Sequence, residues 1–140
     1  MSIEANKAAA RRFYTVVEEV VRSGDVDRFD EVLTADVVDH DPGPGQGPGL
    51  AGIKAAFGEL RAAFPDLAYT IEDVVAEGDK VACRVRWRAT HAGPFLGVPG
   101  SGKTISQQGM DILRIAGGKI AERWGVFDDL ALLKQLGLAS

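Results

Sequence analysis

The sequence predicts an α+β fold, in which helices cover one face of a mostly antiparallel sheet. In the first part of the chain, apolar residues recur every three or four positions, which is the spacing of a helix with one buried face. After Pro65 apolar and polar residues alternate, as in half-buried strands, and glycine-containing turns separate these strands. We expect a single domain over residues 1–140, because this length is enough for one hydrophobic core.

Three helices are expected in the first half of the chain. The first ends at Gly24, which accepts the left-handed conformation of a helix cap, and the second begins after Asp25, which can cap it. A short strand at Val37-Val38 then leads into a glycine- and proline-rich loop over residues 41–49. The third helix ends before Pro65, because the residue before a proline disfavours helical geometry.

The strands follow the third helix. They are expected at residues 67–71, 81–89, 104–115 and 120–127, and a final short helix, capped by Asp128 or Asp129, ends at Gly137. The clearest strand, residues 81–89, has one apolar face and one face that carries three arginines. Its Cys83 is the one cysteine of the chain, so neither an internal disulfide nor a cysteine-rich metal site is expected.

The composition is that of an ordinary globular protein, with 46% hydrophobic and 26% charged residues. The net charge of −4 argues against a nucleic-acid partner, because such domains are usually basic. No apolar run is long enough to span a membrane, and the first residues lack an apolar signal core. We therefore expect no membrane association and a cytoplasmic location.

Residues 97–104, GVPGSGKT, match the phosphate-binding pattern GxxxxGK[ST]. That loop binds phosphates only between a buried strand and the N-terminus of a helix. Here a loop precedes the motif and a strand-like run follows it. We interpret it as a connection between two antiparallel strands.

Four segments, in this order, carry a resemblance to a known family: GDVDRFDEVLTADVVDH, AAFPDL, EGDKVACRVRWRATHAGPFLGVPGSGK and DILRIAGGKIAERWGVFDDLALLKQLG. The chain resembles the SnoaL-like polyketide cyclases, in the ester cyclase branch of the nuclear-transport-factor-like superfamily. Their loop GxFxGxPPTGK is similar to GPFLGVPGSGK. The resemblance implies a cone-shaped, barrel-like αβαβββ fold with a curved sheet against three N-terminal helices. It also implies one deep ligand pocket, and a homodimer formed through the sheets.

The activity implied by the resemblance is ring closure by aldol chemistry on a small, largely apolar carbonyl compound, without a cofactor. Where the cyclases carry a catalytic aspartate on the last strand, this chain has Gly125. Their histidine and glutamine on the preceding strand correspond to Asp111 and Gly109, and an asparagine corresponds to about Asp39. Whether the cyclase activity survives these replacements is left open by the sequence.

Asp111 is the first candidate for a catalytic base. It lies in an apolar run and shares the parity of Leu113 and Ile115, which favours an orientation into the pocket. Burial would raise its pKa towards neutrality. The alternative is an outward orientation, paired with an arginine. His40 and His91, each at a strand end, are the candidate acid–base partners.

Five further residues are candidate substrate contacts: Tyr14, Trp87, Glu122, Trp124 and Asp128. Each has a structural alternative as well. Trp124 can be core, Asp128 can be a helix cap, and Glu122 can pair across the sheet. No local spacing suggests a metal site, and we expect none.

Three functions remain open at this point. The first is a cofactor-independent cyclase, isomerase or hydrolase, whose substrate is a carbonyl compound or an epoxide. The second is a protein that binds an apolar small molecule without converting it, which the missing aspartate at Gly125 favours. The third is a scaffold or dimer module with a vestigial pocket. Whether the loop from Asp39 to Gly49 acts as a lid is also open.

Overall fold

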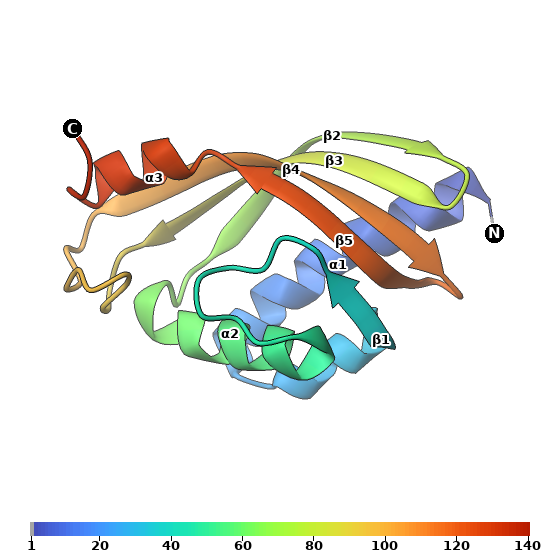
Figure 1. The fold of residues 1–140 in the computed structure, drawn as a ribbon, viewed down its shortest axis with the longest axis horizontal. Helices are drawn as coiled ribbons and strands as arrows, with labels where there is room; N and C mark the ends of the chain where they lie inside the picture. Colours follow the sequence, from blue (N-terminus) through green and yellow to red (C-terminus); the bar gives the residue numbers. More distant parts are fainter. Residues whose placement is uncertain (1) are drawn as a thin grey trace.

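The computed structural model, which describes residues 2–140, has a curved sheet that arches over two long helices (Figure 1). The elements follow the order α1 (Ile3–Ser23), a short 3-10 helix η1 (Val26–Glu31), β1 (Leu33–Asp39), α2 (Gly49–Ala63), β2 (Ala68–Glu77), β3 (Lys80–Thr90), β4 (Thr104–Ala116), β5 (Lys119–Phe127) and α3 (Asp129–Gln135). This is the predicted α+β class, with α1, η1 and α2 as the three N-terminal helices.

The helices begin and end where local chemistry allows. Ser2 caps α1 by accepting a hydrogen bond from the Ala5 N–H, and Gly24 ends the helix with φ 79°. Asp25 precedes η1 but makes no capping hydrogen bond with its side chain, so its predicted role as a cap is wrong. β1 begins at Leu33, earlier than predicted, because Leu33 pairs with Ile120 in the sheet and does not extend the helix face.

The sheet has the strand order β1-β5-β4-β3-β2, and every pair is antiparallel except β1 with β5. It is curved but open, with β1 and β2 as its two edges. α1 and α2 lie under its concave face, and α3 lies at one end of the sheet (Figure 1). Buried side chains of α1, such as Val17 and Val20, pack there with inward residues of the strands, such as Val85 and Leu113.

A β-bulge at Ala121 decides which residues of β5 face inward. Ile115 pairs with Ile120, but the next pair is Arg114 with Glu122, so Ala121 has no partner. Side chains alternate between faces along a strand, and one extra residue reverses the alternation. Beyond the bulge, the odd-numbered residues of β5 therefore face the concave side.

The motif at residues 97–104 lies in the connection between β3 and β4, as interpreted from the sequence. Thr104 begins a strand and no helix follows the motif, so its backbone lacks the geometry of a phosphate-binding loop. Among residues 2–140, no helix combines the length and the hydropathy needed to cross a membrane.

Candidate functional site

A cavity of about 820 Å³ lies between the concave face of the sheet, α2 and the loop that precedes α2. Most of its wall is apolar, with aromatic side chains such as Phe13, Phe57, Phe64 and Phe127. This volume and lining are typical of a site for a small organic molecule.

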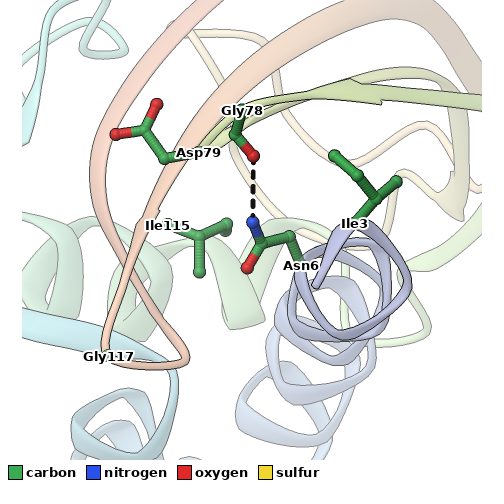
Figure 2. Close-up of a pocket in the computed structure, with 6 residues that line it drawn as sticks. All are labelled: Ile3, Asn6, Gly78, Asp79, Ile115 and Gly117. Atoms are coloured by element: carbon green, nitrogen blue, oxygen red, sulfur yellow. Dashed lines mark hydrogen bonds between the residues drawn. The ribbon is translucent and has the colours of Figure 1, made fainter. Parts of the chain in front are cut away.

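A smaller hollow of about 370 Å³ lies at the N-terminal end of α1 (Figure 2). Asn6 and Asp79 are its only polar side chains among residues 2–140, and Asn6 Nδ2 donates to the Gly78 carbonyl at 3.2 Å. Because this hollow gathers few reactive groups, we place the candidate site in the larger cavity.

The centre of the site is the carboxylate of Asp111, whose side chain is only 4% exposed. Tyr14 on α1 donates its hydroxyl hydrogen to Asp111 Oδ2 at 2.6 Å. Arg123 on β5 donates from Nε to Asp111 Oδ1 at 2.9 Å. Both carboxylate oxygens thus have a partner, and all three residues line the cavity. Of the two orientations that the sequence left open, Asp111 adopts the inward one.

Arg123 joins this carboxylate to the loop that covers the cavity. Its Nη1 donates to Asp39 Oδ1 at 2.9 Å and to the Asp41 carbonyl at 2.8 Å. Gln46 donates to the other oxygen of Asp39 at 3.0 Å, and the Gly125 N–H donates to Asp41 Oδ2 at 2.9 Å. The start of the loop is therefore fixed to β5 through the same arginine that holds Asp111.

Burial and charge act on the pKa of Asp111 in opposite directions. Removal from water raises the pKa, whereas Arg123 and the Tyr14 hydroxyl lower it, and burial has the larger effect. The pKa of Tyr14 is raised by burial and by the adjacent Asp111. Burial also opposes the charge of Arg123, but Asp111 and Asp39 together raise its pKa, so it stays a cation. The site thus holds a carboxylate that is more basic than usual beside a fixed positive charge.

Because Gly125 has no side chain, there is room on its inner side for the ion pair between Arg123 and Asp111. Gly125 pairs with Asp111 across β4 and β5, so both face the same side of the sheet. A Cβ at position 125 would overlap Arg123 Nη2 and would lie 2.6 Å from Asp111 Oδ1. The carboxylate in the cavity is thus supplied by β4, directly opposite the place on β5 where the resemblance implied an aspartate.

Three of the residues predicted from the sequence form a cluster outside the cavity. His40 Nε2 lies 2.8 Å from Glu122 Oε2, and the His40 ring stacks on Trp124 with centroids 4.8 Å apart. Strict alternation from the buried Ile120 would turn Glu122 and Trp124 inward, but the bulge at Ala121 turns them outward. His40, Glu122 and Trp124 thus lie outside the cavity wall, and the catalytic or binding roles proposed for them stay predictions.

The other predicted residues lie in different places. Trp87 and Tyr14 line the cavity. His91 is buried at the end of β3, where its Nδ1 lies 3.1 Å from Ser101 Oγ, but it is not part of the cavity wall. Asp128 caps α3 by accepting from the Ala131 N–H at 3.0 Å, which is its structural alternative. The catalytic or binding roles proposed for these residues stay predictions.

Arg123 and Gln107 line the cavity but were not singled out from the sequence. Gln107 has the same parity as Asp111 in β4, and that signal was present in the alternation. Arg123 was hidden by the bulge, which no short-range pattern reveals. Within residues 2–140, no group of three or more His, Cys, Asp or Glu side chains is arranged to hold a metal ion.

The fold and the cavity define a class of protein: a cone-shaped α+β fold with a largely apolar cavity and a buried carboxylate in its wall. Residues 10–136 match the family described as SnoaL-like polyketide cyclase, and the chain belongs to this family. No curated protein is significantly similar to the chain.

Solved structures agree with this assignment. TsrD from Streptomyces laurentii is 31% identical, with a TM-score of 0.79 over 94% of this chain and 97% of that one. A candidate polyketide cyclase from Acidithiobacillus ferrooxidans is 32% identical, with a TM-score of 0.81 and full coverage of both chains. AclR from Streptomyces galilaeus, described as a candidate hydroxylase, is 27% identical, with a TM-score of 0.81 over 99% and 89% of the two chains.

Proposed function

We propose that the protein is a cofactor-independent enzyme that closes a ring in a small, largely apolar, polyketide-like carbonyl compound by acid–base chemistry. The observation that carries this proposal is the carboxylate of Asp111, which is buried in the wall of an apolar cavity and has a raised pKa. A base with a pKa closer to neutrality is better suited to remove a proton from carbon. Membership of the SnoaL-like family supports a cyclase-type reaction.

In the proposed reaction, Asp111 removes a proton from the carbon next to a carbonyl group. The electron pair of the broken C–H bond forms an enolate, and the enolate carbon attacks a second carbonyl of the same molecule. One C–C bond forms, and the second carbonyl oxygen receives the proton and becomes a hydroxyl. The enolate oxygen needs a hydrogen-bond donor. Arg123 Nη2 is a suitable one, because it makes no hydrogen bond with any other group in residues 2–140.

The proton-abstraction step can be tested without the natural substrate. We expect the protein to catalyse exchange of the methyl hydrogens of 2-acetylnaphthalene for deuterium from D2O, measured by NMR. Asp111→Asn should reduce the protein-catalysed rate by at least a hundredfold, since general base catalysis typically contributes about 10² to 10⁴. His40→Ala is the control, because His40 lies outside the cavity. Equal exchange rates in wild type and Asp111→Asn would contradict the assignment.

The trio Asp39, Arg123 and Asp111 favours a second reaction, hydrolysis of an epoxide. Two carboxyl groups that share one arginine can hold different protonation states, so that one activates water while the other protonates the epoxide oxygen. Hydrolysis of styrene oxide in H2¹⁸O, with ¹⁸O recovered in the diol and lost in Asp111→Asn, would favour this reaction over cyclisation.

One observation favours binding without conversion: both oxygens of Asp111 are engaged, by Tyr14 and by Arg123. A carboxylate held in this way can simply stabilise the wall of a pocket. Native mass spectrometry followed by denaturing extraction tests this alternative. A trapped compound that is recovered unchanged after long incubation with excess protein would support it.

The proposed assembly is a homodimer through the convex face of the sheet. Met110, Ile112 and Val126 are apolar and are 54%, 43% and 78% exposed on this side. Apolar side chains this close together are typical of a surface that another copy covers. A dimer in size-exclusion chromatography with light scattering, converted to a monomer by Ile112→Glu, is the expected result.

A further inference from the structure

The cavity contains a second group of polar side chains, at the end next to α3. Gln107 and Asp111 face the same side of β4 and are four residues apart, which corresponds to about 13 Å along a strand. The ring of Phe127 lies between them over Gly109, where a Cβ would overlap the ring. The two polar groups are therefore separated by an apolar floor.

The side chain of Gln107 has one orientation. Trp87 Nε1 donates to Gln107 Oε1 at 2.9 Å, and Gln107 Nε2 donates to Asp129 Oδ1 at 3.0 Å. Indole can only donate and an ionised carboxylate can only accept, so the amide cannot be reversed. Gln107 is only 6% exposed, which makes this chain of hydrogen bonds a rigid support for Asp129.

The carboxylate of Asp129 has a free oxygen. Within residues 2–140, Asp129 forms no salt bridge, and its Oδ2 accepts no hydrogen bond. It is not needed to cap α3 either, since Asp128 accepts from the Ala131 N–H. Asp129 is exposed, but Gln107 holds one of its oxygens, so the other is free to accept a hydrogen bond from a ligand in the cavity that Asp129 lines.

The charges that line the cavity also favour a ligand that carries a hydrogen-bond donor. Its charged residues are Arg123 and five acids, namely Asp39, Asp41, Glu59, Asp111 and Asp129. Arg123 is the one cation of this lining within residues 2–140, and its ion pairs with Asp39 and Asp111 hold it at the other end of the cavity, so Asp129 has no cation beside it that would bind a carboxylate.

We infer that Gln107 and Asp129 form a second polar subsite, which binds a hydroxyl or protonated amine at the far end of an elongated, largely apolar ligand and disfavours a carboxylate. The inference rests on the proposed function in one respect, because it places the reacting carbonyl of that ligand at Asp111. It adds a selection rule for substrates: a carbonyl at one end and a hydrogen-bond donor at the other.

The test measures binding by isothermal titration calorimetry with four matched probes. These are 2-acetylnaphthalene and its 6-hydroxy, 6-aminomethyl and 6-carboxy derivatives. In wild type, we expect the hydroxy and aminomethyl probes to bind about tenfold more tightly than the parent compound, and the carboxy probe to bind more weakly. No preference for either donor probe, or no measurable binding of them, would overturn the inference.

Asp129→Ala should remove the preference for both donor probes and leave the affinity of 2-acetylnaphthalene unchanged. Asp129→Asn should weaken the aminomethyl probe more than the hydroxy probe, because it keeps an acceptor but loses the charge. Asp36→Asn is the control, since it removes an exposed carboxylate on β1 outside the cavity. An equal loss of affinity for all probes, or no loss in Asp129→Ala, would overturn the subsite. Because only binding is measured, the result does not depend on whether Asp111 catalyses proton exchange.

Discussion

The two faces of β5 carry two networks of similar composition. On the concave face, Arg123 binds the carboxylates of Asp111 and Asp39. On the convex face, Arg114 and His40 bind Glu122, with Nε to Oε1 at 2.6 Å and Nε2 to Oε2 at 2.8 Å. Each network joins β4, β5 and the end of β1. They differ in burial, since the side chain of Asp111 is 4% exposed and that of Glu122 is 26% exposed.

The difference in burial gives the two carboxylates, Asp111 and Glu122, pKa shifts in opposite directions. Burial raises the pKa of Asp111 above its ordinary value of 3.8 in spite of Arg123. The hydrogen bonds from His40 and Arg114 lower the pKa of Glu122 below its ordinary value of 4.5, because water still solvates the carboxylate. Similar partners therefore produce a strengthened base on one face and a stabilised surface ion on the other. The inner network is the one whose carboxylate is a stronger base than usual.

Removing the inner cation should have the largest effect. Arg123→Met leaves Asp111 and Asp39 without their cation in a largely buried place, and we expect a loss of about 3–5 kcal/mol in the free energy of unfolding at pH 7. Part of this loss should be recovered as the pH falls, because Asp111 then takes up a proton. Urea unfolding at several pH values measures both effects. Arg114→Met, on the outer network, should cost much less; equal losses would abolish the distinction between the two faces.

Removing the hydroxyl that supports Asp111 should have the next largest effect. Tyr14→Phe leaves Oδ2 of a buried carboxylate without its donor, and we expect a loss of about 1.5–3 kcal/mol. Tyr69→Phe is a matched control, because the Tyr69 ring packs 5.0 Å from Tyr14 and its hydroxyl makes no hydrogen bond within residues 2–140. Thermal and urea unfolding should rank Tyr14→Phe well below Tyr69→Phe in stability.

Filling the space at Gly125 should separate Arg123 from Asp111. Gly125→Ala places a Cβ against both side chains, and we expect a loss of about 1–3 kcal/mol. Gly58→Ala in α2 meets its nearest atom, Val26 Cγ1, at an ordinary 3.5 Å. It should stabilise the helix by up to about 1 kcal/mol. If both variants changed stability in the same direction, the packing argument for Gly125 would be wrong.

Titration sharpens the comparison without disrupting the fold. In NMR spectra of the side-chain carboxyl carbons, Asp111 should titrate above 3.8 and Glu122 below 4.5.

Between the unfolded and folded pKa of Asp111, the folded state binds the extra proton, so this residue makes the free energy of unfolding fall as pH rises. The folded-state pKa of Glu122 is lowered instead. Its contribution to the free energy of unfolding is therefore present above its unfolded-state pKa and is lost as the pH falls through its folded-state pKa. Asp111→Asn should remove the first dependence, whereas Glu122→Gln should change stability least of all these variants.

Much of the fold could be predicted from the sequence because its elements have clear periods. Alternation in residues 81–89 and 104–115 indicated β3 and β4, and it also placed Asp111 on the concave face. The start of β1 at Leu33 could not be predicted, because a short apolar run fits a helix end as well as a strand.

The site was predictable only as far as alternation holds. Asp111, Trp87 and Tyr14 were singled out and do line the cavity. The orientation of Arg123 and Trp124 depends on the bulge at Ala121, which arises from the pairing of β4 with β5 and has no local signature. Asp39 and Arg123 meet only after β1 has added to the edge of the sheet in parallel, a contact between residues that are far apart in sequence.

The bulge at Ala121 also has a consequence for how such a gene can change. Loss of this one codon would make Ile120, Glu122 and Arg123 consecutive, and strict alternation would then keep Arg123 on the concave face and Glu122 on the convex face, where they are now. A deletion of three nucleotides at this position would thus remove the bulge and leave the cavity wall unchanged. Loss of one codon from Glu122 to Trp124 would instead reverse the faces of the residues that follow it in β5. The hairpin therefore tolerates a change of length at one position and is sensitive to the same change a few residues further on.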